Sequence, residues 1–309
     1  MCTTPFHILM AEKLIEINKN DDFDILFVIQ NDNEKYLYYL NKIKKIVGKV
    51  YVFRANGKRS SLLFWEIIKF KLKNELLNNI QKYYKFYLAS IDSPLFQLIL
   101  TKRKKESLIY TFDDGLANLY KKSIYYKGNP QNFQKKIAYK ILGINESIAS
   151  IKKNAITHYT IYNYDNILKK TNIISLFENK NNLNEFSQIL KIFIGQPYRE
   201  IDENLTNDFV KKIIDKTQAD LYFPHPREVD FSWVDKEVIT SNLIFEEFVL
   251  ELLKINPEMK IQIFSINSSV LFNLSNVNNI EIFFWQNDIL KEKYAQLYEI
   301  MKKFKFNTF

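Results

Sequence analysis

Short apolar runs alternate with longer amphipathic stretches along most of the chain. In the first half, the strand-like runs are residues 23–30, 49–53, 85–90 and 107–112. The stretches with helical spacing between them are residues 34–47, 62–84 and 94–101, and further helices are expected from Leu116 and over residues 131–150. A strand that is followed by a helix and then by another strand favours a mostly parallel sheet covered by helices on both faces. The sequence therefore predicts an α/β fold.

An Asn- and Lys-rich stretch, residues 163–188, interrupts this alternation. The pattern then restarts with strand-like runs at residues 190–194, 219–223, 260–265 and 280–285. A chain of 309 residues is long enough for two domains of about 150 residues each. We therefore predict two α/β domains, residues 1–180 and 181–309.

Composition excludes several classes of protein. A hydrophobic content of 47% supports a sizeable core and argues against disorder. The single cysteine, Cys2, excludes an internal disulfide framework and fits a reducing, cytoplasmic compartment. We find no apolar run long enough for a transmembrane helix and no signal peptide. The net charge of +9 is spread along the chain, so it is compatible with a peripheral position beside an acidic membrane but selects no partner.

The chain starts abruptly. Residues 2–7 read as a strand-to-helix turn, and a helix pattern follows over residues 8–17. Most α/β domains place a first strand before such a turn, and almost nothing precedes it here. We therefore expect that the given start is trimmed or placed too late, and that a longer start supplies this strand.

A histidine between two prolines follows the apolar run at residues 219–223. Both Pro224 and Pro226 lack an amide donor, and a residue before proline is pushed to extended geometry, so His225 is expected at the exit of a strand. In open α/β sheets that exit is where ligands bind. A rigid turn with an incidental histidine is the competing interpretation.

Three other polar segments lie at predicted strand ends. Paired acids such as Asp113 and Asp114 suit proton abstraction or metal binding, whereas Asp-Asp-Gly is also an ordinary turn. Gly195 allows close approach of a ligand or simply a turn. Ser268 and Ser269 can bind a phosphate or cap a helix.

The other histidines and the common catalytic motifs indicate no further site. His7 is interpreted as a capping residue and His158 as a satisfied core or edge histidine. Three histidines and one cysteine give no metal-ligand cluster of recognisable spacing. The glycine-rich dinucleotide motif, the P-loop and the Gly-x-Ser-x-Gly motif do not occur in the sequence.

Taken in order, these segments resemble a known family. The segments that carry the resemblance are Leu9-Met10-Ala11-Glu12-Lys13, Asn33-Glu34-Lys35-Tyr36, Tyr87-Leu88-Ala89-Ser90, Thr111-Phe112-Asp113-Asp114-Gly115, His158-Tyr159-Thr160-Ile161, Pro224-His225-Pro226-Arg227 and the turn at Ser268. Together they are similar to the bacterial sialyltransferases of glycosyltransferase family 52, over nearly the whole length.

The resemblance implies a B-type glycosyltransferase (GT-B) with two Rossmann-like domains, inverting and independent of metal or cofactor. The donor would be CMP-sialic acid. The acceptor would be a terminal galactose of a lipooligosaccharide or capsule, with an α-2,3 linkage. Residues 1–180 would carry the acceptor and residues 181–309 the nucleotide. A position at the inner face of the cytoplasmic membrane and a homodimer are compatible with it.

The resemblance also implies roles for individual residues. His225, with Pro226 beside it, would contact the CMP phosphate and assist its departure. Ser268 and Ser269 match a phosphate-binding turn, and Gly195 belongs to the same donor side. Glu246 matches an acid that binds the ribose hydroxyls.

The catalytic base is less well defined. Family members can carry an aspartate directly after the Gly-x-Pro turn, but Tyr198 stands there, and a phenol with a reference pKa near 10 is a poor base. Glu200 and Asp202 lie nearby. The Asp-Asp-Gly turn supplies the base in related sialyltransferase families, so Asp113 and Glu200 both remain candidates, with Asp114 and Asp202 behind them.

Two other functions stay open. One is an enzyme of the same fold that uses another nucleotide sugar, such as a UDP-hexose. The other is a non-enzymatic basic protein that binds nucleic acid or membrane, which the lack of a concentrated basic block disfavours.

Overall fold

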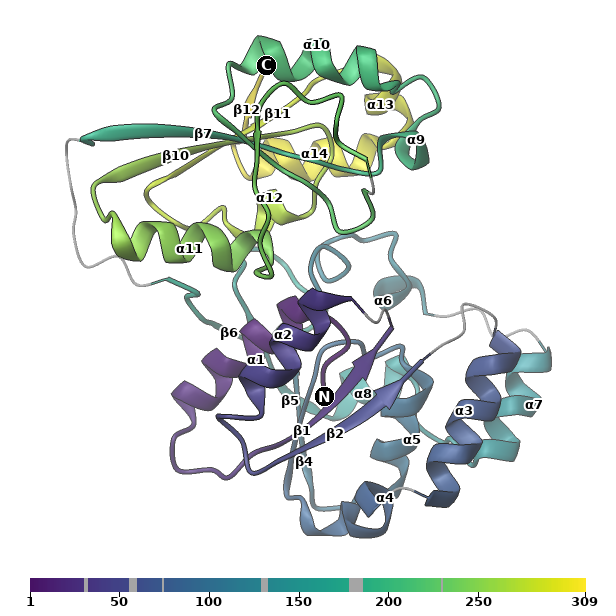
Figure 1. Cartoon of the computed structure of the whole chain (residues 1–309). Coiled ribbons are helices and arrows are strands. Elements are labelled where there is room, and N and C mark those ends of the chain that lie inside the picture. Colours follow the sequence, from purple (N-terminus) through teal and green to yellow (C-terminus); the bar gives the residue numbers. More distant parts are fainter. Residues whose placement is uncertain (31–32, 56–59, 74, 129–132, 178–185, 229) are drawn as a thin grey trace. The chain divides into compact units, whose positions relative to one another are not determined.

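The chain forms two compact units, Met1–Leu176 and Phe177–Phe309, each with its own parallel strands (Figure 1). The structure is a computed structural model that describes residues 1–30, 33–55, 60–73, 75–128, 133–177, 186–228 and 230–309. The mixed α/β architecture confirms the fold class predicted from the alternating pattern. The predicted domain boundary after residue 180 lies outside the described residues.

The first unit alternates strands and helices in the order that the sequence indicates. Its elements are α1 (Pro5–Ile17), β1 (Asp24–Ile29), α2 (Glu34–Ile43), β2 (Lys49–Arg54), α3 (Ser60–Lys73), α4 (Glu75–Asn79), a 3-10 helix (Ile80–Lys82), β3 (Lys85–Leu88), α5 (Pro94–Lys102), β4 (Leu108–Phe112), α6 (Ile124–Lys127), α7 (Phe133–Leu142), α8 (Ile148–Asn154), β5 (Ala155–Thr160) and β6 (Thr171–Ile173). Strand β1 pairs with β2, and β3, β4, β5 and β6 form a four-stranded parallel sheet. Buried side chains from β1, β3 and β4 share one apolar cluster with α5.

The first two residues join these two sheets. The Cys2 amide donates to the Leu26 carbonyl (2.9 Å), and the Val28 amide donates to the Cys2 carbonyl (2.8 Å). On the other side, the Met1 amino group donates to the Tyr87 carbonyl (2.6 Å). Residues 1 and 2 therefore lie between β1 and β3 in the manner of a very short strand.

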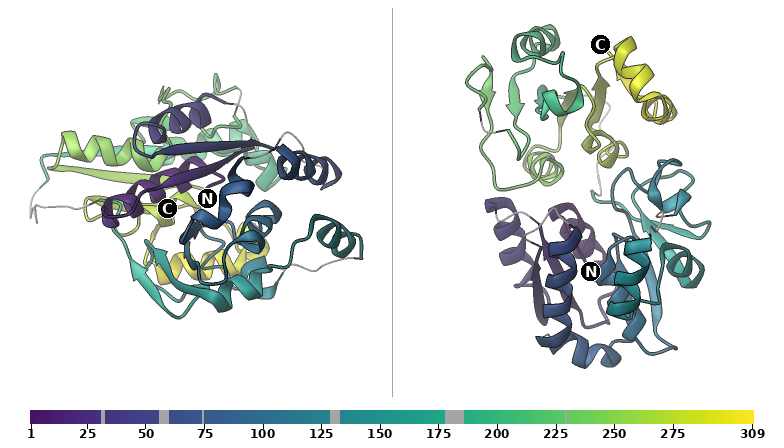
Figure 2. Two further views of the ribbon diagram at one scale, coloured as in Figure 1. Left: turned by 90° about the horizontal axis from the view of Figure 1, so that it is seen from below. Right: turned by 90° about the vertical axis from the view of Figure 1, so that its right-hand side faces the viewer.

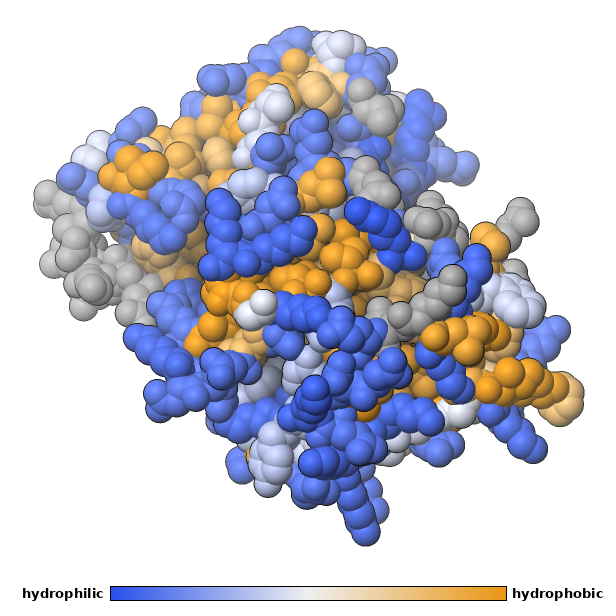
Figure 3. Space-filling view, turned by 60° about the horizontal axis from the view of Figure 1, so that its bottom comes forward, coloured by the Kyte–Doolittle hydropathy of each residue, from blue (hydrophilic) through white to orange (hydrophobic). Residues whose placement is uncertain are grey.

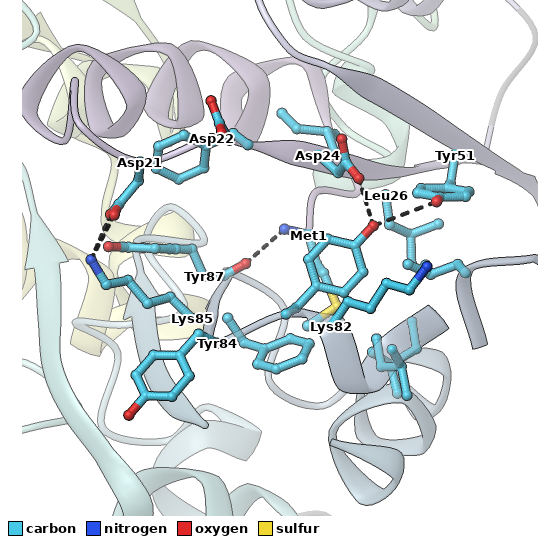
Figure 4. Close-up of a pocket in the computed structure, with 17 residues that line it drawn as sticks. Met1, Asp21, Asp22, Asp24, Leu26, Tyr51, Lys82, Tyr84, Lys85 and Tyr87 are labelled. Atoms are coloured by element: carbon cyan, nitrogen blue, oxygen red, sulfur yellow. Dashed lines mark hydrogen bonds and ion pairs between the residues drawn. The ribbon is translucent and has the colours of Figure 1, made fainter. Parts of the chain in front are cut away.

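A cavity of about 360 Å³ continues the line of this short strand between β1 and β3 (Figure 4). In a parallel ladder, alternate residues of a strand turn their amide and carbonyl toward the same neighbour. Because Leu26 and Tyr87 bond to residues 1 and 2, the backbone groups of Asp24 and Lys85 also face this cavity. The cavity thus has the geometry of a strand position.

This geometry predicts that four strand-forming residues, Ile-Val-Ile-Val, added ahead of Met1 will stabilise the chain. The added strand would pair with β1 and β3, so we expect Tm to rise by at least about 2 °C. An otherwise equal extension with proline at alternate positions is the control, because proline cannot donate to the ladder. Equal Tm values for the two extensions, measured by calorimetry, would contradict the prediction.

The second unit contains one six-stranded sheet among the described residues. Its elements are β7 (Gln188–Ile194), α9 (Tyr198–Ile201), α10 (Asn207–Thr217), β8 (Leu221–Phe223), β9 (Glu237–Val238), α11 (Phe245–Ile255), β10 (Met259–Ser265), α12 (Val270–Asn273), β11 (Ile280–Phe284), α13 (Asp288–Lys293), α14 (Ala295–Lys303) and β12 (Asn307–Thr308). The strand order is β12-β11-β10-β7-β8-β9, and all neighbours are parallel. Helices α10 and α11 lie on opposite faces of this sheet (Figures 1 and 2).

The strand order of this unit has a topological switch point. From β7 the chain moves outward to β8 and β9, and it then returns to β10 on the other side of β7 before continuing to β11 and β12. In open α/β sheets, ligands bind at the carboxyl ends of the strands at such a point. The edge formed by the ends of β7, β8 and β10 is therefore the first place to look for a site.

Two helix predictions are wrong. No helix begins at Leu116, because Gly115 adopts a left-handed φ of 63° and the Asn118 side chain accepts the Asp114 amide at 2.6 Å, which favours a turn. The helix expected over residues 131–150 ends at Leu142, since Gly143 has a φ of 70° and closes α7. Residues 131 and 132 lie outside the described ranges. None of the described helices is long and apolar enough to cross a membrane.

Candidate active site

The turn after β8 holds His225 through a carboxylate. One oxygen of Glu228 accepts the His225 backbone amide (2.6 Å), and the other accepts the Tyr222 hydroxyl (2.7 Å). The His225 Nδ1 atom accepts the Arg227 amide at 3.1 Å. In the neutral ring the proton must then sit on Nε2, so His225 is set up as a hydrogen-bond donor through Nε2.

Gly195 leaves room for this arrangement. A Cβ atom at this position would lie 2.2 Å from a Glu228 carboxylate oxygen and 2.5 Å from the Tyr222 hydroxyl. The structure shows a packing requirement at Gly195 that the sequence did not indicate, and the predicted place of Gly195 on the donor side stays a prediction. The neighbouring Tyr198 is buried with its hydroxyl 3.2 Å from that of Tyr222. Burial raises the pKa of Tyr198 far above its usual value, so this phenol stays protonated.

The ends of β7 and β10 are tied together at the switch point. The Gln196 side-chain oxygen accepts the Asn267 amide at 2.8 Å. Ser268 follows directly; its hydroxyl accepts the Val270 amide at 3.3 Å, while Ser269 is exposed. The structure thus places Ser268 and Ser269 at the same sheet edge as the His225 turn.

Glu246 lies on the first turn of α11, where it is buried. One of its carboxylate oxygens accepts the Asn273 side-chain amide at 2.7 Å, which links α11 to the end of α12. Because α12 begins right after Ser269, this bond brings the predicted ribose-binding acid close to the predicted phosphate-binding turn. Neither Gln196 nor Asn273 was singled out from the sequence, since neither follows a recognisable motif.

The two acids near Tyr198 are both paired with cations. Glu200 forms an exposed ion pair with Arg227. Asp202 accepts the Asn204 amide (3.1 Å) and the Lys293 ammonium (3.2 Å), and these interactions lower its pKa, the Asn204 bond first. The lowered pKa makes the Asp202 carboxylate a weaker base.

In the first unit, Asp113 is completely buried. Its carboxylate accepts the Ile161 amide (2.7 Å) and lies 2.9 Å from the His158 Nε2 atom, and His158 in turn lies 2.8 Å from the Thr111 hydroxyl. The prediction that His158 is a satisfied core histidine is confirmed. Asp113 joins β4 to β5 and has no exposed surface, so its predicted role as the base gains no support.

Asp114, the next residue, lines a cavity of about 800 Å³ at the carboxyl ends of the strands. His7 on α1 places its Nε2 atom 2.6 Å from a carboxylate oxygen of Asp114. Because the His7 Nδ1 atom accepts the Thr3 amide at 3.1 Å, the Nε2 proton points at Asp114. The N-cap of α1 is Thr4, whose hydroxyl accepts the His7 amide, so His7 is not the capping residue that the sequence predicted. His7 instead pairs with Asp114, which the sequence did not indicate.

A second carboxylate shares this cavity. The Tyr125 hydroxyl contacts Asp114 and lies 3.0 Å from an oxygen of Asp92. Burial raises the pKa of Asp92, and the charge of Asp114 raises it further. Burial by itself raises the pKa of Asp114. The charge of His7 and the hydrogen bonds of His7, Tyr125 and Ser90 outweigh burial, so the pKa of Asp114 is lowered. The two acids are therefore tuned in opposite directions, as in acid–base pairs of enzymes.

Asp92 was missed in the sequence, although it follows the predicted strand at residues 85–90 just as Asp113 follows the next one. The rule that polar residues at strand ends form sites would have included it. Within the described parts of the chain, no group of three or more His, Cys, Asp and Glu side chains is placed to hold a metal ion.

Comparison with known proteins decides the family. Residues 20–288 match the family model of glycosyltransferase family 52. The chain belongs to glycosyltransferase family 52. The resemblance seen in the sequence is thereby confirmed.

Curated relatives of this family 52 glycosyltransferase are bacterial sialyltransferases. It is 31% identical to an N-acetyllactosaminide alpha-2,3-sialyltransferase of Haemophilus influenzae, over 94% of this chain and 92% of that protein. It is 25% identical to a CMP-N-acetylneuraminate:beta-galactoside alpha-2,3-sialyltransferase of Pasteurella multocida, over 100% and 97% of the two chains. It is also 25% identical to an N-acetyllactosaminide alpha-2,3-sialyltransferase of Neisseria meningitidis, over 95% and 79%.

The packing around Gly195 predicts a loss of stability on substitution. In Gly195→Ala the new Cβ atom would collide with Glu228 and Tyr222, so we expect the free energy of unfolding of the family 52 enzyme to fall by about 1–3 kcal/mol. Gly48→Ala is a matched control, because its nearest neighbour is a side-chain oxygen of Asp24 at 3.2 Å. Denaturant titration measures both, and equal effects would contradict the packing role of Gly195.

Proposed function

We propose that this enzyme transfers sialic acid from CMP-sialic acid to a terminal galactose of a bacterial surface glycan, a lipooligosaccharide or a capsule, with an α-2,3 linkage. The transfer inverts the anomeric centre and needs no metal ion. The relatives named above support the donor, the galactoside acceptor and the linkage. The observation that carries the proposal is the His225 turn, which sets a protonated Nε2 at the end of a central strand.

We further propose that the two units are the Rossmann-like domains of a GT-B enzyme. Residues 1–180 bind the acceptor and residues 181–309 bind the nucleotide. Each unit has its own parallel strands with polar side chains at their carboxyl ends, which supports this division. The switch point between β7 and β10 supports placing the nucleotide on the second unit.

The chemistry of the leaving group determines which residues the donor site needs. Departure of CMP places negative charge on a phosphate, so hydrogen-bond donors at that phosphate stabilise the transition state. In our proposal His225 donates through Nε2, Pro226 fixes the turn, and the hydroxyls of Ser268 and Ser269 bind the phosphate. Glu246, which lies beside the end of α12, accepts hydrogen bonds from the ribose hydroxyls in this proposal.

The acceptor hydroxyl must lose a proton as it attacks. We assign this proton to Asp92, because a raised pKa makes a carboxylate a stronger base and because Asp92 lines the cavity. Asp114 stays charged beside His7 and keeps the pKa of Asp92 high. The O–H bond of the galactose breaks, the new bond to the anomeric carbon forms, and CMP leaves with the electron pair.

We place the enzyme in the cytoplasm at the inner face of the membrane. A single cysteine suits a reducing compartment, and the net charge of +9 suits an acidic surface. A homodimer stays a prediction.

The donor assignment predicts selective stabilisation by CMP. We expect CMP at millimolar concentration to raise Tm, whereas UMP and ADP have little effect. His225→Ala should lower kcat/KM by about 100-fold or more, because the charge on the departing phosphate loses a donor. Lys254→Ala, an exposed position on α11, is the control variant and should match the unaltered enzyme. Stabilisation by UMP instead of CMP would favour a UDP-sugar donor and contradict the proposal.

The base assignment predicts a pH effect. Asp92 must be ionised to accept a proton, so kcat/KM falls as the pH drops through its raised pKa. Asp114→Asn removes the neighbouring charge, which lowers the pKa of Asp92 and moves the acid limb of the profile to lower pH. Asp92→Asn should cost about 100-fold or more in kcat/KM. An acid limb that stays in place in Asp114→Asn would contradict the coupling.

A further inference from the structure

Two neighbouring helices of the first unit turn apolar side chains toward solvent. The exposed fractions are 50% for Leu62, 60% for Trp65 and 77% for Leu72 on α3, and 78% for Phe133, 44% for Ile137 and 61% for Ile141 on α7. Their spacings of three, four, seven or eight residues place them on one face of each helix. We call these six side chains the apolar strip.

Three side chains of the strip, Trp65, Ile137 and Ile141, meet between the two helices. Helices α3 and α7 pack against each other, and the Lys71 ammonium donates to the Leu142 carbonyl at 3.0 Å. A groove of about 630 Å³ lies along their contact, and Trp65, Ile137 and Ile141 help to line it. Figure 3 shows hydrophobic residues at the surface on the side where Figure 1 places α3 and α7, next to hydrophilic ones.

The side chains of the strip are separate from those with which the two helices pack into the core. The same helices bury Ile67, Phe70, Tyr139 and Leu142 in the core of the unit, so each helix has one apolar face inward and a second one outward. Soluble monomers rarely expose a contiguous apolar patch of this kind without a binding function.

The charges beside the strip are almost all positive. Lys69, Lys136 and Lys140 are exposed on the two helices, and Lys71 and Lys135 are partly exposed. Glu66 is the single acidic residue in the sequence of α3 and α7. Aromatic and aliphatic side chains flanked by lysines match the boundary between acyl chains and anionic headgroups. Nucleic acid would instead require aromatic rings for stacking, and only two of the six side chains, Trp65 and Phe133, are aromatic.

We propose that the apolar strip and its lysines are a docking surface for an anionic phospholipid membrane. Leu62, Trp65, Leu72, Phe133, Ile137 and Ile141 enter the boundary of the bilayer, and the lysines contact the headgroups. This surface deepens the membrane position proposed above, and it is tested by binding to vesicles rather than by glycosyl transfer. A failure of vesicle binding is therefore distinguishable from a failure of the proposed activity.

The test is co-sedimentation of the full chain with vesicles of phosphatidylcholine, with and without phosphatidylglycerol. We expect binding to the anionic vesicles that weakens with salt and is absent for pure phosphatidylcholine. The variants Trp65→Ser/Ile137→Ser and Lys136→Glu/Lys140→Glu should each lower the partition coefficient by about tenfold or more. Ile255→Ser, which removes a side chain that is 75% exposed on α11, is the matched control and should bind as the unaltered chain does.

Stabilisation by CMP, measured on each variant, shows that the variants remain folded. Absence of binding to anionic vesicles overturns the proposal, and so does equal binding of all variants. Conversion of a dimer to a monomer by Trp65→Ser/Ile137→Ser, without any change in vesicle binding, would show that the strip is an interface between copies and would also overturn it. Tighter binding to DNA or RNA than to vesicles at the same salt concentration would also overturn the proposal.

Discussion

The Glu228 carboxylate is the contact on which the proposed donor site depends. It accepts one hydrogen bond from the His225 backbone and one from Tyr222, and so connects the loop after β8 to the strand itself. Burial raises the pKa of Glu228, whereas these two bonds work against that rise. Its position also explains why a glycine must follow strand β7, because any side chain at Gly195 would displace the carboxylate. A histidine held at backbone and ring in this way loses little freedom on binding a phosphate.

Adjacent aspartates divide two tasks in the first unit. Asp113 and Asp114 leave the end of β4 in different directions, so one enters the core and the other faces the cavity. The buried Asp113 contacts His158 and accepts the backbone amide of Ile161, and these contacts hold the end of β4 against β5. The other pairs with His7 and shares Tyr125 with Asp92. A buried carboxylate whose hydrogen bonds are all made within the protein stabilises the fold. A carboxylate that acts as an acid or base must instead be accessible to the substrate.

The sequence predicts the strands well because their apolar runs are buried on both faces. It also places the polar residues at the strand ends, where His225, Ser268 and Asp114 are found. It does not say which of two neighbouring aspartates turns inward, because that depends on contacts with Ile161 and His158, far along the chain. The helix expected from Leu116 is absent for a local reason, because Gly115 has a left-handed backbone and forms a turn. The sequence does not determine whether a glycine adopts this conformation.

Pairs formed across the chain are the least predictable feature. His7 and Asp114 are far apart in sequence, and no spacing rule links either of them to Asp92 or Tyr125. The same holds for the apolar strip: the helical pattern of α7 is visible in the sequence, but only the packing shows which apolar side chains remain outside. Propensity and periodicity determine elements, whereas the identity of a site depends on how these elements meet.

The most direct test of the central claim is to identify the product of the reaction. The enzyme would be incubated with CMP-sialic acid and a β-galactoside, and the products resolved by NMR spectroscopy. Our account predicts an α-linked sialyl galactoside, joined at O3 of the galactose, together with an equal amount of CMP. Absence of a sialylated product, or transfer from a UDP-hexose in its place, would contradict it.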